Sequence, residues 1–140
     1  MDCNNILVRL SFCSKASRLK LMRSVIKDAA DIVGLNNEQA DEVVLAVNEA
    51  CMNVIQHSYL MNPDGQIEVE IAADEQALLF RIRDYAPAVD SASCCSRDLD
   101  EVRPGGLGVH FIQTLMDECG FLAQPEGGGN LFQMKKYIRQ

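Results

Sequence analysis

The sequence predicts a single domain of the α+β class over residues 1–140, and two observations lead to this prediction. First, the chain is 48% apolar and 24% charged, a globular composition, and its 140 residues suit one domain with its own core. Second, segments with strand-like patterning occur largely in pairs, with helical segments between them. Paired strands separated by helices are typical of a two-layer sandwich of helices packed on a sheet.

The first part of the chain predicts one strand followed by a helix. Residues 6–12 alternate roughly between apolar and polar side chains, as a half-buried strand does. Ser14 is a candidate N-cap for a helix that continues through Val33, and Gly34 then ends it. Apolar side chains recur in this helix every three or four residues, which predicts a core-facing stripe. The stripe consists of Leu19, Met22, Val25, Ile26, Ala29, Ile32 and Val33.

A second helix and a β-hairpin are expected next. Either Asn36 or Asn37 caps the helix, which runs to about Ser58. Residues 66–73 and 77–83 then predict two antiparallel strands, because turn-forming residues bound and join them. The positions of the helix that are predicted to face the core are Ala40, Val43, Val44, Val47, Cys51 and Val54.

The last part of the chain combines a long loop, a helix and a second hairpin. Residues 85–104 are mostly small, polar or turn-forming, and a loop of that length in a compact domain is usually functional, for example a lid. A helix follows the turn at residues 105–108, and residues 121–124 and 130–138 predict a closing hairpin. The side chains expected to face inward from this helix are Val109, Ile112, Leu115, Met116 and Cys119.

Charge and cysteine content argue against several classes of function. Thirteen Lys and Arg against twenty Asp and Glu give a net charge of −7, whereas nucleic acids and anionic membranes bind basic surfaces. No segment approaches the roughly 20 apolar residues of a membrane span, and the start of the chain lacks a secretion signal, so we expect a cytoplasmic protein. The six cysteines form no C-x-x-C pair and only two histidines are present, which argues against a zinc site.

The second helix carries the most informative side chain. Between residues 43 and 58 only Glu49 is formally charged at pH 7, whereas a solvated helix face carries several charges. At about 100° per residue, Glu49, Asn53 and His57 lie along one line on the face opposite the core. A semi-apolar face with a few polar groups is typical of a pocket wall. A carboxylate there needs a partner, which is either a ligand group or an arginine across the core.

Two further segments are candidate ligand-binding features. Residues 105–108, Gly-Gly-Leu-Gly, lead directly into a helix, where backbone amides and the helix dipole favour a phosphate. A tight turn alone explains these glycines equally well or better. Asp84 ends a strand and suits recognition of an exocyclic amine such as that of adenine, although a simple turn residue is the better reading of Asp84 by itself.

Together these segments resemble the GHKL ATPase superfamily and, within it, the bacterial anti-sigma factor serine/threonine kinases. Residues 49–57 match the N-box pattern E-A-x-x-N-x-x-x-H, and residues 84–87 resemble the adenine-binding box. Residues 105–118 are similar to the segment G-G-L-G-x-x-x-I-x-x-L-M-D-E, and residues 128–130 stand where the family has a G-G-T/N strand start. The match runs along essentially the whole chain in the right order, which makes it more specific than any single box.

The resemblance implies a fold, a ligand and roles for individual residues. The fold is a mixed, mainly antiparallel sheet covered on one face by helices, with Mg-ATP between helix and lid. Asn53 would be the ligand of Mg²⁺, Glu49 would be the general base on a serine or threonine hydroxyl, and Asp84 would read the adenine. The backbone of residues 105–109 would hold the phosphates. The implied nucleotide-binding residues are Asn53, His57, Asp84, Ala86, Gly105, Gly106, Leu107, Gly108, Val109 and Asn130.

The chain departs from the family pattern at two places in or near the expected lid. Ala86 stands where the adenine box has glycine, which costs about 1 kcal/mol or more if the backbone there needs a positive φ and little otherwise. Cys94-Cys95 has no explanation in the pattern. Arg97 and Arg103 are candidates for neutralising charge on the γ-phosphate, although solvated lid charges explain them at least as well.

The leading hypothesis from the resemblance is an anti-sigma factor kinase that forms homodimers through the first strand and helix. It would phosphorylate a small STAS-type antagonist and, in another state, sequester a sigma factor. The alternative is a non-catalytic binding module whose partner surface is shaped by nucleotide. Glu49 favours the kinase, because a pure binder needs Asn53 and Asp84 but no base. A detached histidine-kinase catalytic domain is disfavoured, since the chain shows no phosphoacceptor helix.

Overall fold

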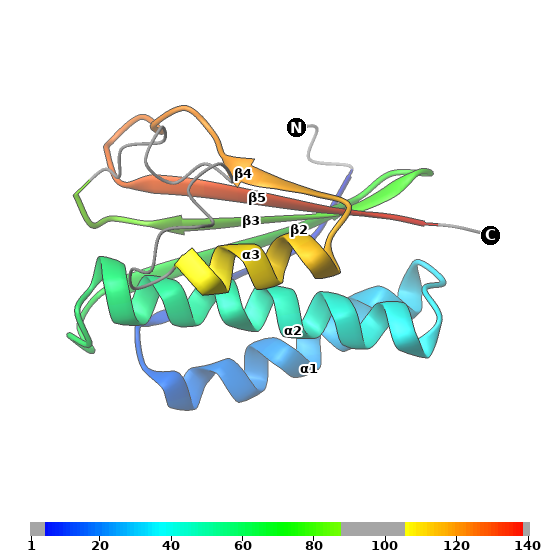
Figure 1. Ribbon diagram of the computed structural model, residues 1–140, viewed down its shortest axis with the longest axis horizontal. Coiled ribbons are helices and arrows are strands. Elements are labelled where there is room, and N and C mark those ends of the chain that lie inside the picture. Colours follow the sequence, from blue (N-terminus) through cyan, green and yellow to red (C-terminus); the bar gives the residue numbers. More distant parts are fainter. Residues whose placement is uncertain (1–4, 88–105, 139–140) are drawn as a thin grey trace.

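The computed structural model describes residues 5–87 and 106–138, with the backbone alone for residues 106–109. A β-sheet forms one layer and the helices lie against one of its faces (Figure 1), so the predicted two-layer α+β fold is confirmed. The elements are, in chain order, β1 (Ile6–Cys13), η2 (Ala16–Arg18), α1 (Leu19–Ile32), α2 (Asn37–Asn53), η3 (Val54–Ser58), β2 (Gln66–Ala73), β3 (Ala77–Asp84), α3 (Gly106–Leu115), β4 (Glu118–Phe121) and β5 (Asn130–Tyr137).

The sheet has the strand order β1-β2-β3-β5-β4, and each of its four strand pairings is antiparallel. The expected mixed, mainly antiparallel sheet is therefore antiparallel throughout the described residues. β1 and β4 are the edge strands. In the register of the central strands, Asp84 at the end of β3 pairs with Ile67 of β2 on one side and with Asn130 of β5 on the other.

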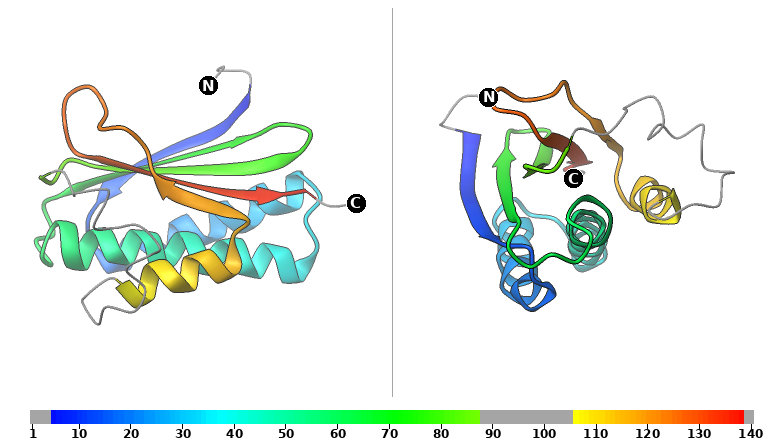
Figure 2. Two further views of the ribbon diagram at one scale, coloured as in Figure 1. Left: turned by 45° about the horizontal axis from the view of Figure 1, so that its top comes forward. Right: turned by 90° about the vertical axis from the view of Figure 1, so that its left-hand side faces the viewer.

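The core lies between the inner face of the sheet and the three α-helices of the described residues. Strand side chains largely alternate between this face and the outside, and rough alternation of this kind predicted β1. α2 packs against both α1 and α3 (Figure 2). Each large apolar side chain that is fully buried contributes about 1.5–3 kcal/mol. The largest of them are Phe80, Leu19, Met22, Ile26, Ile55, Ile67, Ile71, Leu78, Ile112, Met134, Val43 and Val47.

Local sequence features explain where α1 ends and where α2 begins. Gly34 adopts a φ of +87°, a conformation that favours glycine, and it ends α1 as predicted. Asn36, and not Asn37, caps α2. Its side chain accepts the backbone N–H of Gln39 at 2.8 Å, and the Gln39 side chain accepts the backbone N–H of Asn36 at 3.0 Å. This reciprocal pair is a capping box.

Two predictions about the first helix are wrong. Ser14 is not an N-cap, because its hydroxyl donates to the carbonyl of Asn62 at 2.6 Å and fastens the end of β1 to the α2–β2 turn. A 3-10 turn, η2, precedes α1 instead. Ile32, assigned to the core stripe, is 74% exposed, since it lies in the last turn of α1 beyond the sheet-facing stripe.

Two element boundaries also differ from prediction. α2 is α-helical to Asn53, and the predicted extension to Ser58 is a π-helical turn. β4 spans Glu118–Phe121, three residues earlier than expected, so Cys119 belongs to a strand and not to α3. At the end of α3 the Lys136 ammonium group donates to the Leu115 carbonyl at 2.6 Å, and pairing with β5 begins three residues later, at Glu118.

In the described parts of the chain, no helix is both long enough and apolar enough to span a bilayer.

Candidate functional site

Glu49 lies half-buried near the C-terminal end of α2. Among the described residues, no lysine or arginine forms an ion pair with its carboxylate. Arg23 of α1, which could have been such a partner, donates to the neighbouring Asn48 at 2.9 Å instead. The interpretation of Glu49 as one half of an ion pair across the core is therefore excluded for residues 5–87 and 106–138. Its carboxylate is available to accept a hydrogen bond from a ligand group.

Asn53 is the last residue of α2 and is also half-buried. It lies one helical turn after Glu49 on the same helix, as the sequence predicts. His57 was expected to continue the same line, but it belongs to the π-helical turn η3, where the wider spacing shifts the angular position of each residue, and it is exposed. Glu49 and Asn53 therefore lie on the same face of α2, and His57 does not continue that α-helical line.

Asp84 is a buried carboxylate, only 3% exposed, and it faces the helix layer at the end of β3. Its Oδ1 atom accepts the backbone N–H of Ala86 at 3.0 Å and the side-chain amide of Asn130 at 2.9 Å. Burial raises the pKa of Asp84, while hydrogen bonds from Asn130, Ala86 and the Ser58 hydroxyl oppose this rise. A carboxylate has about four lone-pair positions, so Asp84 can accept a further N–H donor.

The replacement of glycine by alanine at position 86 carries no backbone penalty. The residues with positive φ in the described chain do not include Ala86, so its backbone is one that any L-residue adopts. Its side chain is buried beside the Asp84 carboxylate. Asn130 also donates to the carbonyl of Pro87 at 3.2 Å, which closes the turn that follows β3. Three predicted residues, Asp84, Ala86 and Asn130, are therefore brought into direct contact.

Gly129 holds this turn against β5, a role that the sequence did not reveal beyond its place in a glycine pair. It has a φ of +86°, and a Cβ atom there would lie 2.0 Å from the carbonyl oxygen of Asp84. Only a residue without a side chain allows so close an approach. The carboxylate of Asp84 is therefore placed by the packing of two backbones as well as by hydrogen bonds.

Ser58 and Tyr59 also belong to the site and were missed by the sequence analysis. The Ser58 hydroxyl bonds the carboxylate of Asp84. The hydroxyl of Tyr59 accepts the backbone N–H of Tyr85 at 2.7 Å and donates to the carbonyl of Gln66 at 2.7 Å. The available signal was their position directly after the N-box, but nothing in the sequence marks the π-helical turn that precedes Tyr59.

The glycine-rich segment leads into a helix, as predicted. α3 begins at Gly106 and packs against α2, so its N-terminus and the C-terminal half of α2 lie toward the same end of the molecule (Figure 1). Backbone N–H groups at such a terminus are free to bind an anion. The backbones of Gly106, Leu107, Gly108 and Val109 form this first turn. Gly105 and the lid residues Cys94, Cys95, Arg97 and Arg103 lie outside the described residues.

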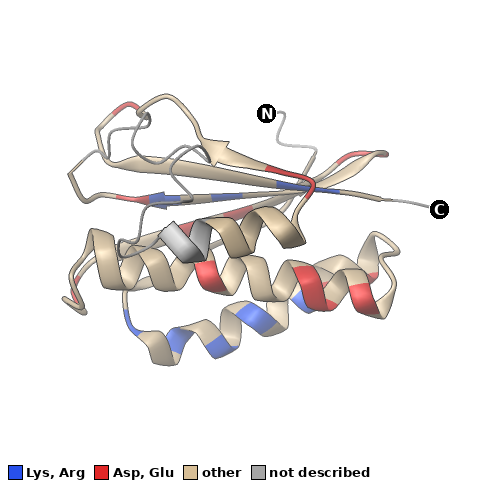
Figure 3. Ribbon diagram, viewed as in Figure 1, with Lys and Arg blue, Asp and Glu red and all other residues tan. Residues whose placement is uncertain are grey.

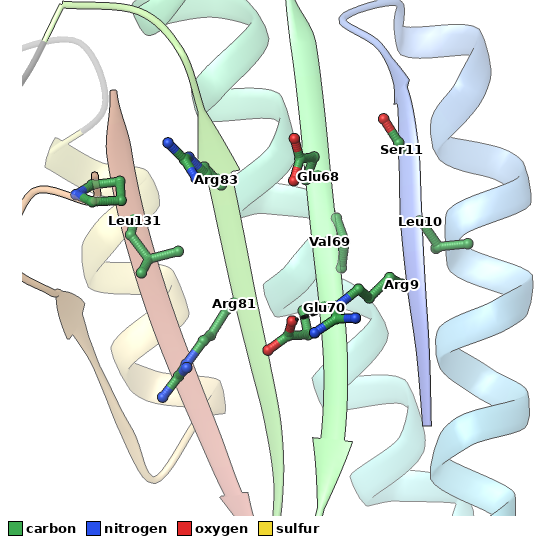
Figure 4. A pocket seen from close by; sticks show the side chains of 10 residues that line it. Arg9, Leu10, Ser11, Glu68, Val69, Glu70, Arg81, Arg83 and Leu131 are labelled. Carbon is green, nitrogen blue, oxygen red and sulfur yellow. Dashed lines mark hydrogen bonds and ion pairs between the residues drawn. The ribbon is translucent and has the colours of Figure 1, made fainter. Parts of the chain in front are cut away.

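A separate groove of about 440 Å³ lies on the helix-free face of the sheet (Figure 4). Each of its charged side chains already has a partner within the protein. Arg9 pairs with Glu70 at 2.8 Å, Arg81 donates to the Gln133 side chain at 2.8 Å, and Glu68 accepts the Tyr85 hydroxyl. Arg83 donates to two carbonyls of the β4–β5 loop. The sheet separates this groove from α2 and from Asp84. It is therefore not the site formed by the predicted residues.

The predicted residues suit an adenine nucleotide with a hard divalent cation. Asp84 offers a buried acceptor for an exocyclic amine, Asn53 offers an amide oxygen, and the start of α3 offers backbone donors for phosphate. The described residues contain no cluster of three or more His, Cys, Asp or Glu side chains that would bind a metal by themselves. A cation held by one amide oxygen would need the phosphates as further ligands, as is usual for Mg²⁺.

Comparison with known proteins identifies the family. The family model described as "Histidine kinase-like ATPase domain" matches residues 12–136. The chain is similar to the serine-protein kinase RsbW of Bacillus subtilis (strain 168), with 26% identity over 106 residues, which span 70% of this chain and 66% of that protein. It is similar also to RsbW of Listeria monocytogenes serotype 4a (strain HCC23), with 29% identity over 141 residues, covering 95% of this chain and 88% of that protein.

A solved structure shows the same fold. A chain of the SiaB-SiaC complex from Pseudomonas aeruginosa superimposes with a TM-score of 0.66 at 16% identity, covering 96% of this chain and 91% of the other. At that identity the likeness concerns the fold alone. Because the family model covers most of the chain, and the N-box helix, the buried Asp84 and the glycine-initiated α3 occur in the family's order, the chain belongs to the histidine kinase-like ATPase family.

Proposed function

We propose that this protein is an ATP-dependent serine/threonine protein kinase that acts as an anti-sigma factor and phosphorylates a small antagonist protein in the cytoplasm. The observation that carries the proposal is Glu49, a half-buried carboxylate without an ion-pair partner among the described residues, one helical turn before Asn53. The names of the similar proteins, which are serine-protein kinases, support the same reaction.

We assign a separate role in phosphoryl transfer to each of the site residues. Glu49 accepts the proton of the substrate hydroxyl as its oxygen attacks. Asn53 would give its amide oxygen to Mg²⁺, and Asp84 would accept a hydrogen bond from the adenine amine. Mg-ATP would supply the phosphoryl group and the neutralising charge, and ADP would leave as its bond to the γ-phosphorus breaks. The glycine-rich segment 105–109 would bind the phosphates, and His57, Ala86 and Asn130 are the remaining residues that we assign to the nucleotide. Such chemistry is mainly positioning, so one base and a phosphate cradle suffice.

The charge of α1 supports a protein substrate that docks beside α2. In a chain of net charge −7, five exposed cations lie in and just before α1, and no acidic residue lies among them (Figure 3). Arg18 and Lys20 lie at the N-terminal end of α1, where a positive charge opposes the helix dipole, so helix stability does not explain these two. We assign an acidic surface of a STAS-type antagonist to this face, with a sigma factor as a second partner. The five cations are Lys15, Arg18, Lys20, Arg23 and Lys27.

Replacing Lys20 and Lys27 by glutamate tests this docking face. We expect a higher KM for the antagonist and an unchanged KM for ATP, because neither side chain belongs to the nucleotide site. An equal rise in both KM values would contradict the assignment.

Exposed apolar side chains on β1 and α1 support a homodimer. Leu7 of β1 is 41% exposed, and Leu21 and Ile32 of α1 are 72% and 74% exposed. Exposed apolar side chains and an unpaired strand edge, such as that of β1, are typical of an interface between subunits. We expect Leu21→Glu and Ile32→Glu to lower the sedimentation coefficient to that of a monomer. Leu122→Glu, next to the opposite edge strand, is the matched control. A protein that sediments as a monomer without any substitution would refute the dimer.

Transfer of label from radiolabelled ATP tests the kinase assignment. The protein is mixed with each candidate antagonist, and we expect label on a serine or threonine of one of them. Glu49→Gln should abolish transfer and leave Mg-ATP binding intact, because it removes the base but no ligand of the nucleotide. Asn53→Ala should instead weaken binding that depends on Mg²⁺. Asp41→Asn, an exposed change on the same helix, is the control and should alter neither.

The outcomes separate the hypotheses. Full transfer by Glu49→Gln would remove Glu49 as the base. Wild-type affinity for Mg-ATP in Asn53→Ala would remove Asn53 as the metal ligand. Tight binding of Mg-ATP and of the antagonist, without any transfer by the wild-type protein, would favour the non-catalytic, nucleotide-gated binding module.

A further inference from the structure

The end of α2 has an unusual backbone course. After Asn53 the chain makes the π-helical turn η3, in which the N–H of Tyr59 bonds the carbonyl of Val54 at 2.9 Å. Leu60 and Met61 then take φ values of +52° and +66°, a region that residues other than glycine rarely adopt. π-helical turns and such backbone outliers concentrate at functional sites. Tyr59 stands between these two features, and its side chain reaches the ends of β2 and β3.

The Tyr59 hydroxyl makes two hydrogen bonds that connect separate strands. It accepts the backbone N–H of Tyr85, directly after β3, and donates to the carbonyl of Gln66, the first residue of β2; both distances are 2.7 Å. The ring rests on Gly65, where a Cβ atom would lie 2.5 Å from the ring carbons. Burial raises the pKa of Tyr59, so the phenol keeps the proton that it donates.

The Tyr85 N–H belongs to the peptide that follows Asp84. On its other side, the same peptide is in close contact with Gly129, and the next N–H, that of Ala86, bonds the Asp84 carboxylate. The backbone on both sides of the Asp84 side chain is therefore held in place. Two residues connect this segment to the helix that carries Asn53: Ser58 bonds the Asp84 carboxylate, and Tyr59 bonds the backbone N–H of Tyr85.

We propose that Tyr59 is a positioning residue of the nucleotide site, whose hydroxyl holds the Asp84–Ala86 segment at a set position relative to the end of α2. This inference rests on the proposed function, because it assumes that Asp84 reads the base and Asn53 holds the metal. A carboxylate held in place discriminates between a base with an amino group, which donates to it, and a base with a keto oxygen, which repels it. Tyr59 therefore sets the preference for adenine over guanine nucleotides.

Titration of the full chain with Mg-ATP and Mg-GTP, each carrying a fluorescent ribose label, tests this role. Tyr59→Phe keeps the ring on Gly65 and removes both hydrogen bonds. We expect it to weaken Mg-ATP binding about tenfold, the effect of losing one to two net hydrogen bonds, and to leave the weak binding of Mg-GTP unchanged. Tyr137→Phe is the matched control, since it removes an exposed hydroxyl that bonds Glu118 at the far end of β5, and it should change neither affinity.

The same titration distinguishes failure of this inference from failure of the proposed function. If the wild-type protein does not bind Mg-ATP, both the proposed function and the role of Tyr59 are refuted. If it does and Tyr59→Phe loses affinity for both nucleotides by the same factor, or for neither, Tyr59 has no positioning role. Should Tyr59→Phe not fold, amide exchange in the wild-type protein replaces it. We expect the Tyr85 amide to be protected and to exchange more slowly with Mg-ATP, and an exchange rate that Mg-ATP leaves unchanged would overturn the inference.

Discussion

Replacement of Gly129 by alanine tests how the site is built, and the geometry allows its effect to be worked out. Gly129 has a φ of +86°, and an added Cβ would lie 2.0 Å from the carbonyl oxygen of Asp84 and 3.0 Å from the carbonyl carbon of Asp84 and from Cα of Tyr85. Gly128 has a φ of +87°, but the nearest atom to an added Cβ is the Gln124 side-chain nitrogen at 4.0 Å. The two glycines thus share their backbone strain and differ in their surroundings.

The expected losses follow from two terms. An L-residue in the left-handed region costs about 1–2 kcal/mol, and this term applies to both Gly128→Ala and Gly129→Ala. A contact as short as 2.0 Å must be relieved by movement of the backbone of β5 or of the turn at Asp84, and overpacking of this kind costs about 1–3 kcal/mol. We therefore expect Gly128→Ala to lose about 1–2 kcal/mol of unfolding free energy and Gly129→Ala about 2–5 kcal/mol.

Urea unfolding of both variants, with wild-type protein alongside, measures the difference as a shift in midpoint at an unchanged m-value. A parallel titration with Mg-ATP should show that Gly129→Ala also loses affinity, since relief of the contact moves Asp84. Equal destabilisation by the two substitutions would refute the argument, because it would mean that the contact between Gly129 and Asp84 imposes no constraint.

Three further predictions follow from buried polar groups. Because burial raises the pKa of Asp84, its contribution to stability is present at acid pH and is lost as pH rises through the folded-state pKa. Asp84→Asn should therefore be neutral or stabilising in thermal unfolding at neutral pH, with a smaller advantage at about pH 4, while Mg-ATP affinity falls. Lys136→Met should lower the free energy of unfolding in urea by about 2 kcal/mol, since Lys136 is 7% exposed, bonds a helix-end carbonyl and also pairs with Glu42 at 3.5 Å. Glu42→Gln should lower it by less, and equal losses would contradict this prediction. Burial raises the pKa of the Cys51 thiol and Cys13 is exposed, so iodoacetamide should label Cys13 and spare Cys51 in the native protein, as read by peptide mass spectrometry.

Much of the fold could be predicted because its signals are local. The rough alternation in β1, the turn residues around β2 and β3, and the apolar stripes of α1 and α2 predicted element types that the structure confirms. The errors lie at ends of elements. Ser14, β4 and the last turn of α2 depend on partners distant in sequence, such as Asn62 and Lys136, which no local pattern contains.

The candidate site was predictable only in part for the same reason. Glu49 and Asn53 were found because one helix places residues four apart on adjacent positions. Asp84 was a candidate from its place at a strand end, and the resemblance added Asn130, but their direct hydrogen bond depends on the register of β3 with β5. Tyr59 and Gly129 were missed, since their roles consist of contacts with the backbone of other strands.

By itself, the sequence determined the two-layer fold, the core-facing side chains of the helices and the presence of a lone acid and an amide on α2, because hydrophobic periodicity and helix geometry act over a few residues. The tertiary structure decided that no lysine or arginine of the described residues pairs with Glu49, that Ala86 is free of backbone strain, and that Asp84 is held by Asn130, Gly129 and the end of α2. These outcomes depend on which segments meet when the chain closes on itself, and burial and hydrogen bonding across strands exist only once they have met.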